Sequence, residues 1–165
     1  MFWYDNAIIY HIYPLGFCGA PTFNDDGPIE YRLDKIYEWI DHFKKLNITA
    51  VYFGPVFESV QHGYDTTDYT KIDRRLGDNE SFKKICRTLH DNGIKIILDG
   101  VFNHVGRKFP KFVDIQQNGR NSAYCGWFQN LNFDGNSPCG DNFWYEGWNG
   151  HYNLVKLNLQ NVGVC

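Results

Sequence analysis

Short apolar segments alternate with amphipathic ones along the first 105 residues of the chain, and few folds accommodate that order. Continuous apolar runs with β-branched residues predict three strands, at 7–13, 48–53 and 94–98. Between them, apolar residues recur at three- and four-residue steps over 33–46 and 82–89, which predicts two helices with one buried face each. The expected order is therefore β-α-β-α-β.

The predicted strands lack polar alternation, so we expect them to be buried on both faces, as in a parallel sheet with right-handed crossovers. Asp78 or Asn79 is expected to cap the second helix, and Asn92-Gly93 to end it. Two architectures fit, a doubly wound sheet and a TIM barrel. The turn at 14–19 lacks a G-x-G-x-x-G pattern and no Walker A motif occurs, which disfavours a dinucleotide site.

Beyond residue 105 the periodicity is weak, and the chain is rich in Asn, Gly and aromatic residues. We interpret 106–165 as an irregular insertion domain that follows the third strand, and 1–105 as the first domain. Long segments without regular structure are commonly functional. The three tryptophans of the insertion are expected to form its small core; they are Trp127, Trp144 and Trp148.

Composition is that of a globular protein, with 43% hydrophobic and 21% charged residues. The net charge of −3 argues against nucleic acid or an anionic membrane as partner, because both require a basic surface. No apolar run approaches the ~20 residues of a membrane span, and no signal peptide is predicted. The five cysteines include no CxxC pair, which argues against a zinc knuckle or a redox dithiol, and their odd number favours a reduced, cytoplasmic setting. Aromatic residues make up 18%, consistent with a large core or with a site that stacks flat ligands.

Polar side chains follow the second and third predicted strands. In both architectures ligands bind at the carboxyl ends of parallel strands, so these residues are expected to share one rim. Each also has a structural interpretation, since Asp commonly caps turns and a lone His is commonly structural. The residues are Glu58, His62, Tyr64, Asp65, Asp68, Tyr69, Asp99, Asn103 and His104.

Three segments resemble motifs of the α-amylase family of glycoside hydrolases. Residues 99–104 read D-G-V-F-N-H and match the family's D-G-V-x-N-H block after the third barrel strand. Residues 63–69 read G-Y-D-T-T-D-Y and match its G-Y-D-x-x-D-Y block after the second. Residues 156–158 read K-L-N, as in the neopullulanase and cyclomaltodextrinase branch. The resemblance implies the first three strands and two helices of a (β/α)8 barrel, followed by the insertion.

The resemblance also implies roles for individual residues in an α-glucan or maltodextrin site. Tyr64 would stack under a sugar ring, because pyranose C–H faces pack well on aromatic rings. Asp65 would accept hydrogen bonds from sugar hydroxyls, and His104 would donate to the 6-hydroxyl of the same sugar. Asp99 would hold the loop and neighbouring charged groups. Asn158 would contribute to the wall of the cleft on the insertion side.

Calcium is the candidate cofactor, because in many members the residue equivalent to Asn103 binds calcium through its side-chain oxygen, a ligand that suits a hard cation. The family's nucleophilic Asp, acid/base Glu and third Asp follow later strands. No G-x-R-x-D block is present, so we expect the catalytic residues to lie beyond Cys165 and assign none. A complete barrel takes roughly 200–250 residues, so we expect a part of a larger enzyme that is inactive alone.

The function expected from the resemblance is retaining hydrolysis of α-glucans of the starch or maltodextrin type. Two alternatives remain at this point. The chain could be a non-catalytic glucan-binding piece, or the parent could be a transglycosylase of the same clan, since water and sugar compete for the same glycosyl-enzyme intermediate. Linkage specificity and oligomeric state are not predicted.

Overall fold

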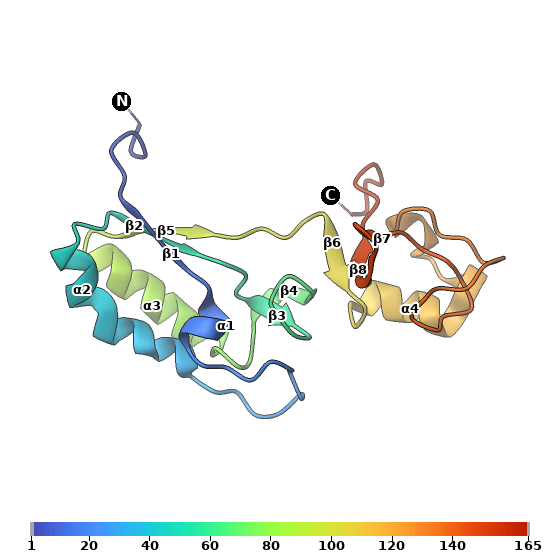
Figure 1. The fold of residues 1–165 in the computed structure, drawn as a ribbon, viewed down its shortest axis with the longest axis horizontal. Helices are drawn as coiled ribbons and strands as arrows, with labels where there is room; N and C mark the ends of the chain where they lie inside the picture. The colour runs from blue at the N-terminus through green and yellow to red at the C-terminus, as the bar shows by residue number, and fades with distance from the viewer. Residues whose placement is uncertain (1, 165) are drawn as a thin grey trace. The chain divides into compact units, whose positions relative to one another are not determined.

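The computed structural model describes residues 2–164, so Cys165 lies outside the described residues. Short strands and helices alternate along the chain (Figure 1). In order, they are β1 (Ile9–Ile12), α1 (Pro14–Phe17), the 3-10 helix η1 (Arg32–Trp39), α2 (Ile40–Lys45), β2 (Ala50–Phe53), β3 (Phe57–Ser59), β4 (Thr66–Ile72), α3 (Asn79–Asp91), β5 (Lys95–Leu98), β6 (His104–Gly106), α4 (Pro110–Asn118), the 3-10 helices η2 (Gly119–Asn121) and η3 (Cys125–Trp127), β7 (Gly147–Trp148) and β8 (His151–Lys156).

The described chain forms two compact units, and each is built from two separate stretches of sequence. The first unit contains the residues up to Glu58 together with Thr70–Gly100. The second contains Ser59–Tyr69 together with the residues from Val101 onward. None of the helices in the described part of the chain is long and apolar enough to cross a membrane.

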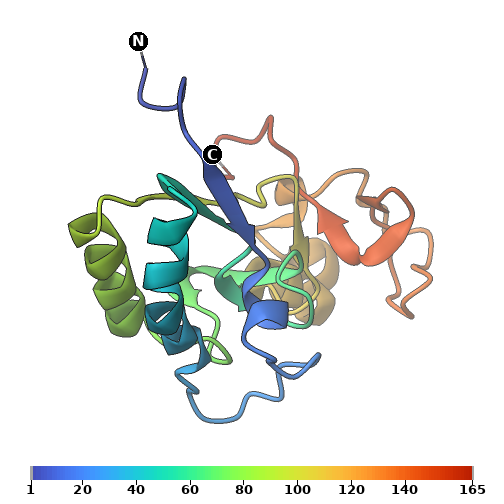
Figure 2. The same ribbon diagram turned by 60° about the vertical axis from the view of Figure 1, so that its left-hand side comes forward.

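A parallel sheet forms the centre of the first unit, with the strand order β1-β2-β5. Its register pairs Ile9 with Ala50 and Val51 with Ile96. Helices α2 and α3 lie side by side on one face of this sheet (Figures 1 and 2). Phe43 and Leu89 from these helices are buried in one core with Val51. The predicted parallel pairing of these three strands is confirmed, whereas α1, β3 and β4 were not predicted.

The ends of α3 follow the sequence signals. The Asp78 carboxylate accepts a hydrogen bond from the Ser81 amide at 2.7 Å, and the Ser81 hydroxyl accepts one from the Asp78 amide at 2.9 Å. This reciprocal capping box satisfies amides that the helix leaves free. Gly93 follows the helix with φ = 75°, a conformation that glycine adopts without strain. The helix predicted over 33–46 is divided into the 3-10 helix η1 and the α-helix α2, and Tyr31 provides no side-chain cap at its start.

The prediction that all three strands are buried on both faces was wrong for β1 and β5. Ile9 is 49% exposed and Leu98 is 40% exposed, whereas Ala50, Val51 and Phe53 of β2 are fully buried. β1 and β5 are the edges of a three-stranded sheet that the helices cover on one face only. Only the central strand is therefore enclosed.

The second unit has regular structure and a core of its own, so the prediction of an irregular insertion was wrong. Strands β6, β8 and β7 form an antiparallel sheet in that order. Helix α4 begins at Pro110, as prolines at the first helical position favour, and ends at Gly119 with φ = 55°. Phe112 from α4 contacts the rings of Phe143 and Tyr145, with centroids 5.8 and 4.9 Å apart. The core consists of Val105, Phe112, Ile115, Phe128, Phe143, Tyr145, Val155 and Leu157.

Candidate functional site

Two segments that are far apart in sequence meet in the second unit, one before and within β4 and one at β6. Asp65 and His104 are both buried, with exposed fractions of 4% and 6%. A side chain at Gly106 would not fit, because an added Cβ would lie 2.4 Å from the main-chain oxygen of Asp65. The glycine therefore lets β6 approach the backbone of Asp65 and brings His104, two residues earlier, into the same unit.

Each of these two buried side chains has one polar atom without a hydrogen-bond partner. These atoms are Oδ1 of Asp65 and Nε2 of His104, and they are the two such buried atoms among the described residues. A buried polar group without a partner costs about 1–3 kcal/mol, so native proteins rarely leave one unpaired without a functional reason. The pair therefore marks this place as the candidate site.

His62 lies near Asp65 but does not satisfy it. Its Nδ1 atom is 3.7 Å from Asp65 Oδ1, which is beyond hydrogen-bond distance. The same Nδ1 accepts a hydrogen bond from the Tyr64 amide at 3.2 Å, so in the neutral ring it carries no proton to donate. The Asp65 oxygen therefore has no hydrogen-bond partner among the described residues.

His104 has a side-chain neighbour on one ring nitrogen and nearby charges around the ring. The side-chain nitrogen of Asn103 lies 3.2 Å from Nδ1 of His104. Burial lowers the pKa of His104 below its usual value, partly opposed by a hydrogen bond with the Tyr64 backbone and by the Asp65 charge. His104 is therefore favoured in its neutral form, within reach of the electrostatic influence of Asp65.

Aromatic rings line the hollow beside these groups. Its volume is about 460 Å³, within the range of small-ligand sites, ~300–1,000 Å³. Tyr64 and Trp148 contribute large rings to it and are 39% and 41% exposed. Trp148 was expected to form the core of the insertion, and that prediction was wrong, because its ring lies at the surface on the β7–β8 hairpin. The lining residues are His62, Tyr64, His104, Trp148, His151, Asn153 and Leu154.

Tyr69 anchors the segment that leads to His104, a role that was not predicted from the sequence. Its hydroxyl donates to the main-chain oxygen of Val101 and lies 3.3 Å from that of His104. Burial raises the pKa of Tyr69 to about 12, so the hydroxyl stays protonated. The second Tyr of the G-Y-D-x-x-D-Y block is the sequence signal that marks it.

Three other predicted residues lie elsewhere. The Asn158 side chain is held by the insertion itself, since it donates to the Gly126 main-chain oxygen at 3.0 Å and accepts from the Gln160 amide at 3.2 Å. The Asn103 side chain is exposed and contacts the His104 ring. Asp99 follows β5 in the first unit, where its amide donates to the Phe53 main-chain oxygen at 2.9 Å. Roles for these residues in ligand binding stay predictions.

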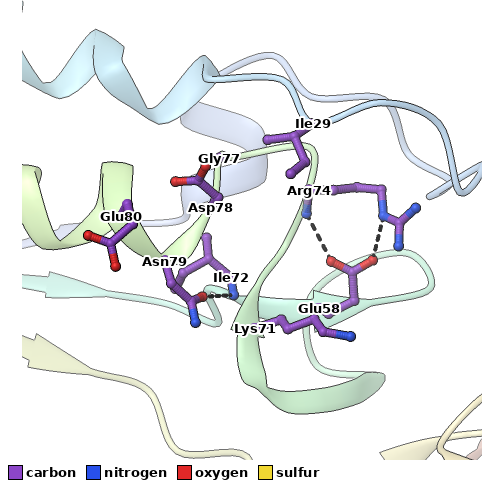
Figure 3. A pocket seen from close by; sticks show the side chains of 9 residues that line it. All are labelled: Ile29, Glu58, Lys71, Ile72, Arg74, Gly77, Asp78, Asn79 and Glu80. Atoms are coloured by element: carbon purple, nitrogen blue, oxygen red, sulfur yellow. Dashed lines mark hydrogen bonds and ion pairs between the residues drawn. The ribbon is translucent and has the colours of Figure 1, made fainter.

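Glu58, another polar residue of the predicted rim, is held by internal contacts in the first unit. Figure 3 shows its carboxylate between the backbone and side chain of Arg74. Arg74 donates to it from the amide and from Nε, at 2.9 and 2.8 Å, and Asn24 donates at 2.9 Å. In the pocket that Figure 3 shows, the Asn79 side chain accepts a hydrogen bond from the Ile72 amide at 2.9 Å. Glu58 therefore stabilises the first unit.

Comparison with known proteins shows similarity over nearly the whole chain. Residues 12–161 match the family model described as "Alpha amylase, catalytic domain". The chain is 40% identical over 141 residues to a cyclomaltodextrinase from Bacillus sp, a match that covers 76% of this chain and 25% of that protein. It is 38% identical over 142 residues to neopullulanase 2 from Thermoactinomyces vulgaris, covering 76% and 24%.

Solved structures are similar as well. A cyclic α-maltosyl-(1→6)-maltose hydrolase from Arthrobacter globiformis superposes with a TM-score of 0.82 at 30% identity, covering 98% of this chain and 40% of that one. A debranching enzyme from Nostoc punctiforme superposes with a TM-score of 0.80 at 32% identity, covering 98% and 38%. The chain spans 25% or less of the length of the two curated relatives above.

Proposed function

The chain belongs to the α-amylase family of glycoside hydrolases, and from this premise we propose that its second unit holds one glucosyl ring of an α-glucan substrate. Tyr64 stacks against the ring, while Asp65 accepts from a sugar hydroxyl and His104 donates to the 6-hydroxyl. Relatives named cyclomaltodextrinase and neopullulanase support a substrate of the maltodextrin type. The reaction of the whole enzyme is hydrolysis with retention of configuration.

The observation that carries this proposal is the pair of unsatisfied buried atoms beside an exposed ring. A sugar hydroxyl both donates and accepts, so one ring can pair Asp65 Oδ1 and His104 Nε2 together. The Tyr64 ring, 39% exposed, provides the apolar contact that a pyranose face favours. A ligand without hydroxyls would leave both buried atoms unpaired and would be rejected by that cost.

Bond cleavage requires groups that this proposal does not assign to the chain. Retaining hydrolysis uses two carboxyl groups about 5–5.5 Å apart, one as nucleophile and one as acid/base. Asp65 is the one carboxylate that the proposal places at the sugar, so the pair that cleavage requires is not present. We therefore assign substrate-holding residues and no catalytic residue. In the complete barrel, β1, β2 and β5 are the first three strands, and the residues from 106 form an insertion domain after the third.

Calcium remains a proposal for this chain. Asn103 would offer its side-chain oxygen, and calcium takes six to eight oxygen ligands. The described residues contain no cluster of three or more His, Cys, Asp or Glu side chains able to hold a metal. The ion would therefore need main-chain, amide or water oxygens beside Asn103, and no step of the reaction is derived from it.

Two substitutions test the site, in this chain for binding and in the full-length parent for activity. Asp65→Asn removes the charge at nearly constant shape, and His104→Ala removes the donor. We expect each to weaken maltohexaose binding, and to lower kcat/KM of the parent, by about 10- to 100-fold, the range for a hydrogen bond to a charged or buried group. The matched control is Asp134→Asn, because Asp134 is an exposed carboxylate in a surface ion pair with Arg120.

The outcomes separate the alternatives. Binding by the chain without turnover supports a substrate-holding part, and product analysis of the parent distinguishes hydrolysis from glycosyl transfer. Unchanged binding and kinetics in both site variants, with the control also unchanged, would refute the assignment of Asp65 and His104.

A further inference from the structure

One nitrogen of the His62 ring lies near two groups of opposite hydrogen-bonding character. Nδ1 accepts a hydrogen bond from the Tyr64 amide at 3.2 Å, and the same atom lies 3.7 Å from Asp65 Oδ1. An unprotonated ring nitrogen can accept from the amide but cannot donate to the carboxylate, whereas a protonated one can only donate. The protonation state of His62 therefore decides which of these two neighbours the atom can bind.

His62 is accessible to solvent protons and lies against both parts of the proposed sugar site. Its side chain is 40% exposed, whereas that of Asp65 is 5% exposed. The ring centroids of His62 and Tyr64 are 6.1 Å apart, with the planes 38° apart, and both residues line the same hollow. A change in the charge of His62 would therefore act on the sugar platform and on the proposed acceptor together.

The other titratable groups around this hollow oppose a charge on His62. His104 on β6 and His151 on β8 line the hollow as well, and either would repel a protonated His62 ring if it were charged itself. Burial lowers the pKa of His104, so this ring stays neutral to lower pH than an ordinary histidine. Asp65, 3.7 Å away, supplies the opposite charge that favours protonation of His62.

Protonation of His62 would change two contacts on which sugar binding depends. The new N–H would reach Asp65 Oδ1, the buried oxygen without a partner among the described residues, once the two atoms approach by about 0.5–1 Å. A charge-assisted hydrogen bond of this kind is about twice as strong as a neutral one, so it competes with a sugar hydroxyl for the same oxygen. The Tyr64 amide would lose its acceptor at the same time, because both groups would then be donors.

We propose that His62 is a positioning residue whose protonation closes the glucosyl site, so that α-glucan binding weakens as the pH falls from ~8 to ~5, the range in which histidine ordinarily gains its charge. This inference rests on the proposed function and deepens it, because it adds regulation of the same site. His62 acts through Tyr64 and Asp65 and needs no contact with the sugar.

Calorimetric titration of the chain with maltohexaose at pH 8 and pH 5.5 measures the effect. We expect the wild type to bind about tenfold more weakly at the lower pH, as expected for competition by one hydrogen bond between charged groups. Binding and protonation are linked, so sugar binding should also release protons at ~pH 6, which titrations in buffers of different ionisation enthalpy detect.

Two substitutions at this position separate the hydrogen bond from the charge. His62→Asn should bind like the wild type at pH 8 and lose most of the pH dependence, because asparagine commonly accepts from the amide two residues later and does not titrate. His62→Ala should bind about 2- to 10-fold more weakly than the wild type at pH 8, because the Tyr64 amide loses its acceptor. A purely structural histidine would not show this rescue by asparagine.

His90→Asn is the matched control, because His90 is an exposed histidine in the last turn of α3, in the first unit. It should keep the wild-type affinity and the wild-type pH dependence. Near-UV circular dichroism checks the fold of each variant. NMR of the wild type needs no substitution, since the Tyr64 amide proton should shift with the same pH midpoint as the His62 ring.

The outcomes distinguish this inference from the proposed function. If the wild type binds maltohexaose equally at both pH values, if His62→Asn keeps the full pH dependence, or if the Tyr64 amide does not follow the His62 ring, the inference is overturned and the proposed function stands. If the wild-type chain does not bind maltohexaose at pH 8 either, both are overturned.

Discussion

Gly106 offers the sharpest test of how the site is built, because a single methyl group should displace it. In Gly106→Ala the new Cβ would lie 2.4 Å from the Asp65 main-chain oxygen and 3.0 Å from its carbonyl carbon. An ordinary van der Waals contact begins at 3.4 Å, so β6 and the Asp65 backbone must separate by about 1 Å. Overpacking of this kind in a buried region costs about 1–3 kcal/mol.

The displacement should affect stability and ligand binding together. In a chain of this size each kcal/mol lowers the melting temperature by about 2–4 °C, so thermal unfolding should begin several degrees lower. Sites hold their geometry within about 0.5 Å, so a separation of about 1 Å between Asp65 and His104 should weaken maltohexaose binding by at least about tenfold. Circular dichroism melts and calorimetric titration measure the two effects.

Gly135→Ala is the matched control within the same unit. Its added Cβ would meet the Trp144 Cβ at 3.4 Å, an ordinary contact, and Gly135 has no positive φ. We expect this variant to melt and bind like the wild type. If Gly106→Ala behaves the same way, the close approach of β6 to Asp65 does not position the site, and the reasoning is wrong.

Three further predictions follow from individual contacts. Tyr69→Phe should lower the free energy of unfolding by about 1–3 kcal/mol, because the Val101 main-chain oxygen loses its donor, and should also weaken glucan binding through His104. Thermal melts and titration measure the two effects, and if neither changes, Tyr69 does not anchor this segment. Because burial lowers the pKa of His104, NMR titration should give a pKa below 6.5. The contribution of His104 to the free energy of unfolding should be complete above pH ~6.5 and lost as the pH falls through the folded-state pKa. In His104→Gln this pH dependence of the unfolding free energy in urea should disappear, and an unchanged dependence would contradict the prediction. If Asn103 holds calcium, chelation with EDTA should lower the melting temperature of the wild type and not of Asn103→Ala, whereas an unaltered wild-type melt would argue against the ion.

The first unit was predictable because its signals are local. The apolar steps of α3, its Asp78 cap and its Gly93 end all lie within one helix and act on the same backbone. The exposure of Ile9 and Leu98 was not predictable, because a run of apolar residues records which side chains a strand carries, not what covers each face. An apolar pattern therefore predicts the strand more securely than its burial.

The core of the second unit was not predicted, because its contacts join residues that are far apart in the sequence. Helix α4 repeats its buried positions only once, at Phe112 and Ile115, so its periodicity is weak. Its stability depends on Phe143 and Tyr145, which follow about thirty residues later and pack against Phe112. Such contacts have no local pattern, although Pro110 at the start and Gly119 at the end were available as boundary signals.

The sequence could name candidate residues for the site but not the contacts that each of them makes. The motif blocks name Tyr64, Asp65 and His104, and the fold brings them into one unit. That one oxygen of Asp65 and one nitrogen of His104 lack partners depends on distances such as the 3.7 Å from His62, which no sequence pattern contains. Asn158 is a motif residue whose side-chain amide donates to the Gly126 main-chain oxygen. Its contact therefore stabilises the second unit, which the motif alone does not indicate.

The sequence next to Trp148 contains a local signal for its position, which the interpretation of Trp148 as a core residue did not use. Asn-Gly between two short segments is the strongest short-range indication of a two-residue hairpin turn, and Asn149-Gly150 is such a pair. A hairpin there places Trp148 and His151 directly opposite each other across the turn, where cross-strand rings contact one another. A tryptophan beside a tight turn at the end of a short hairpin has little protein above it to enclose its ring. The turn signal therefore argued for a surface position, which is where the structure places the Trp148 ring, in contact with His104.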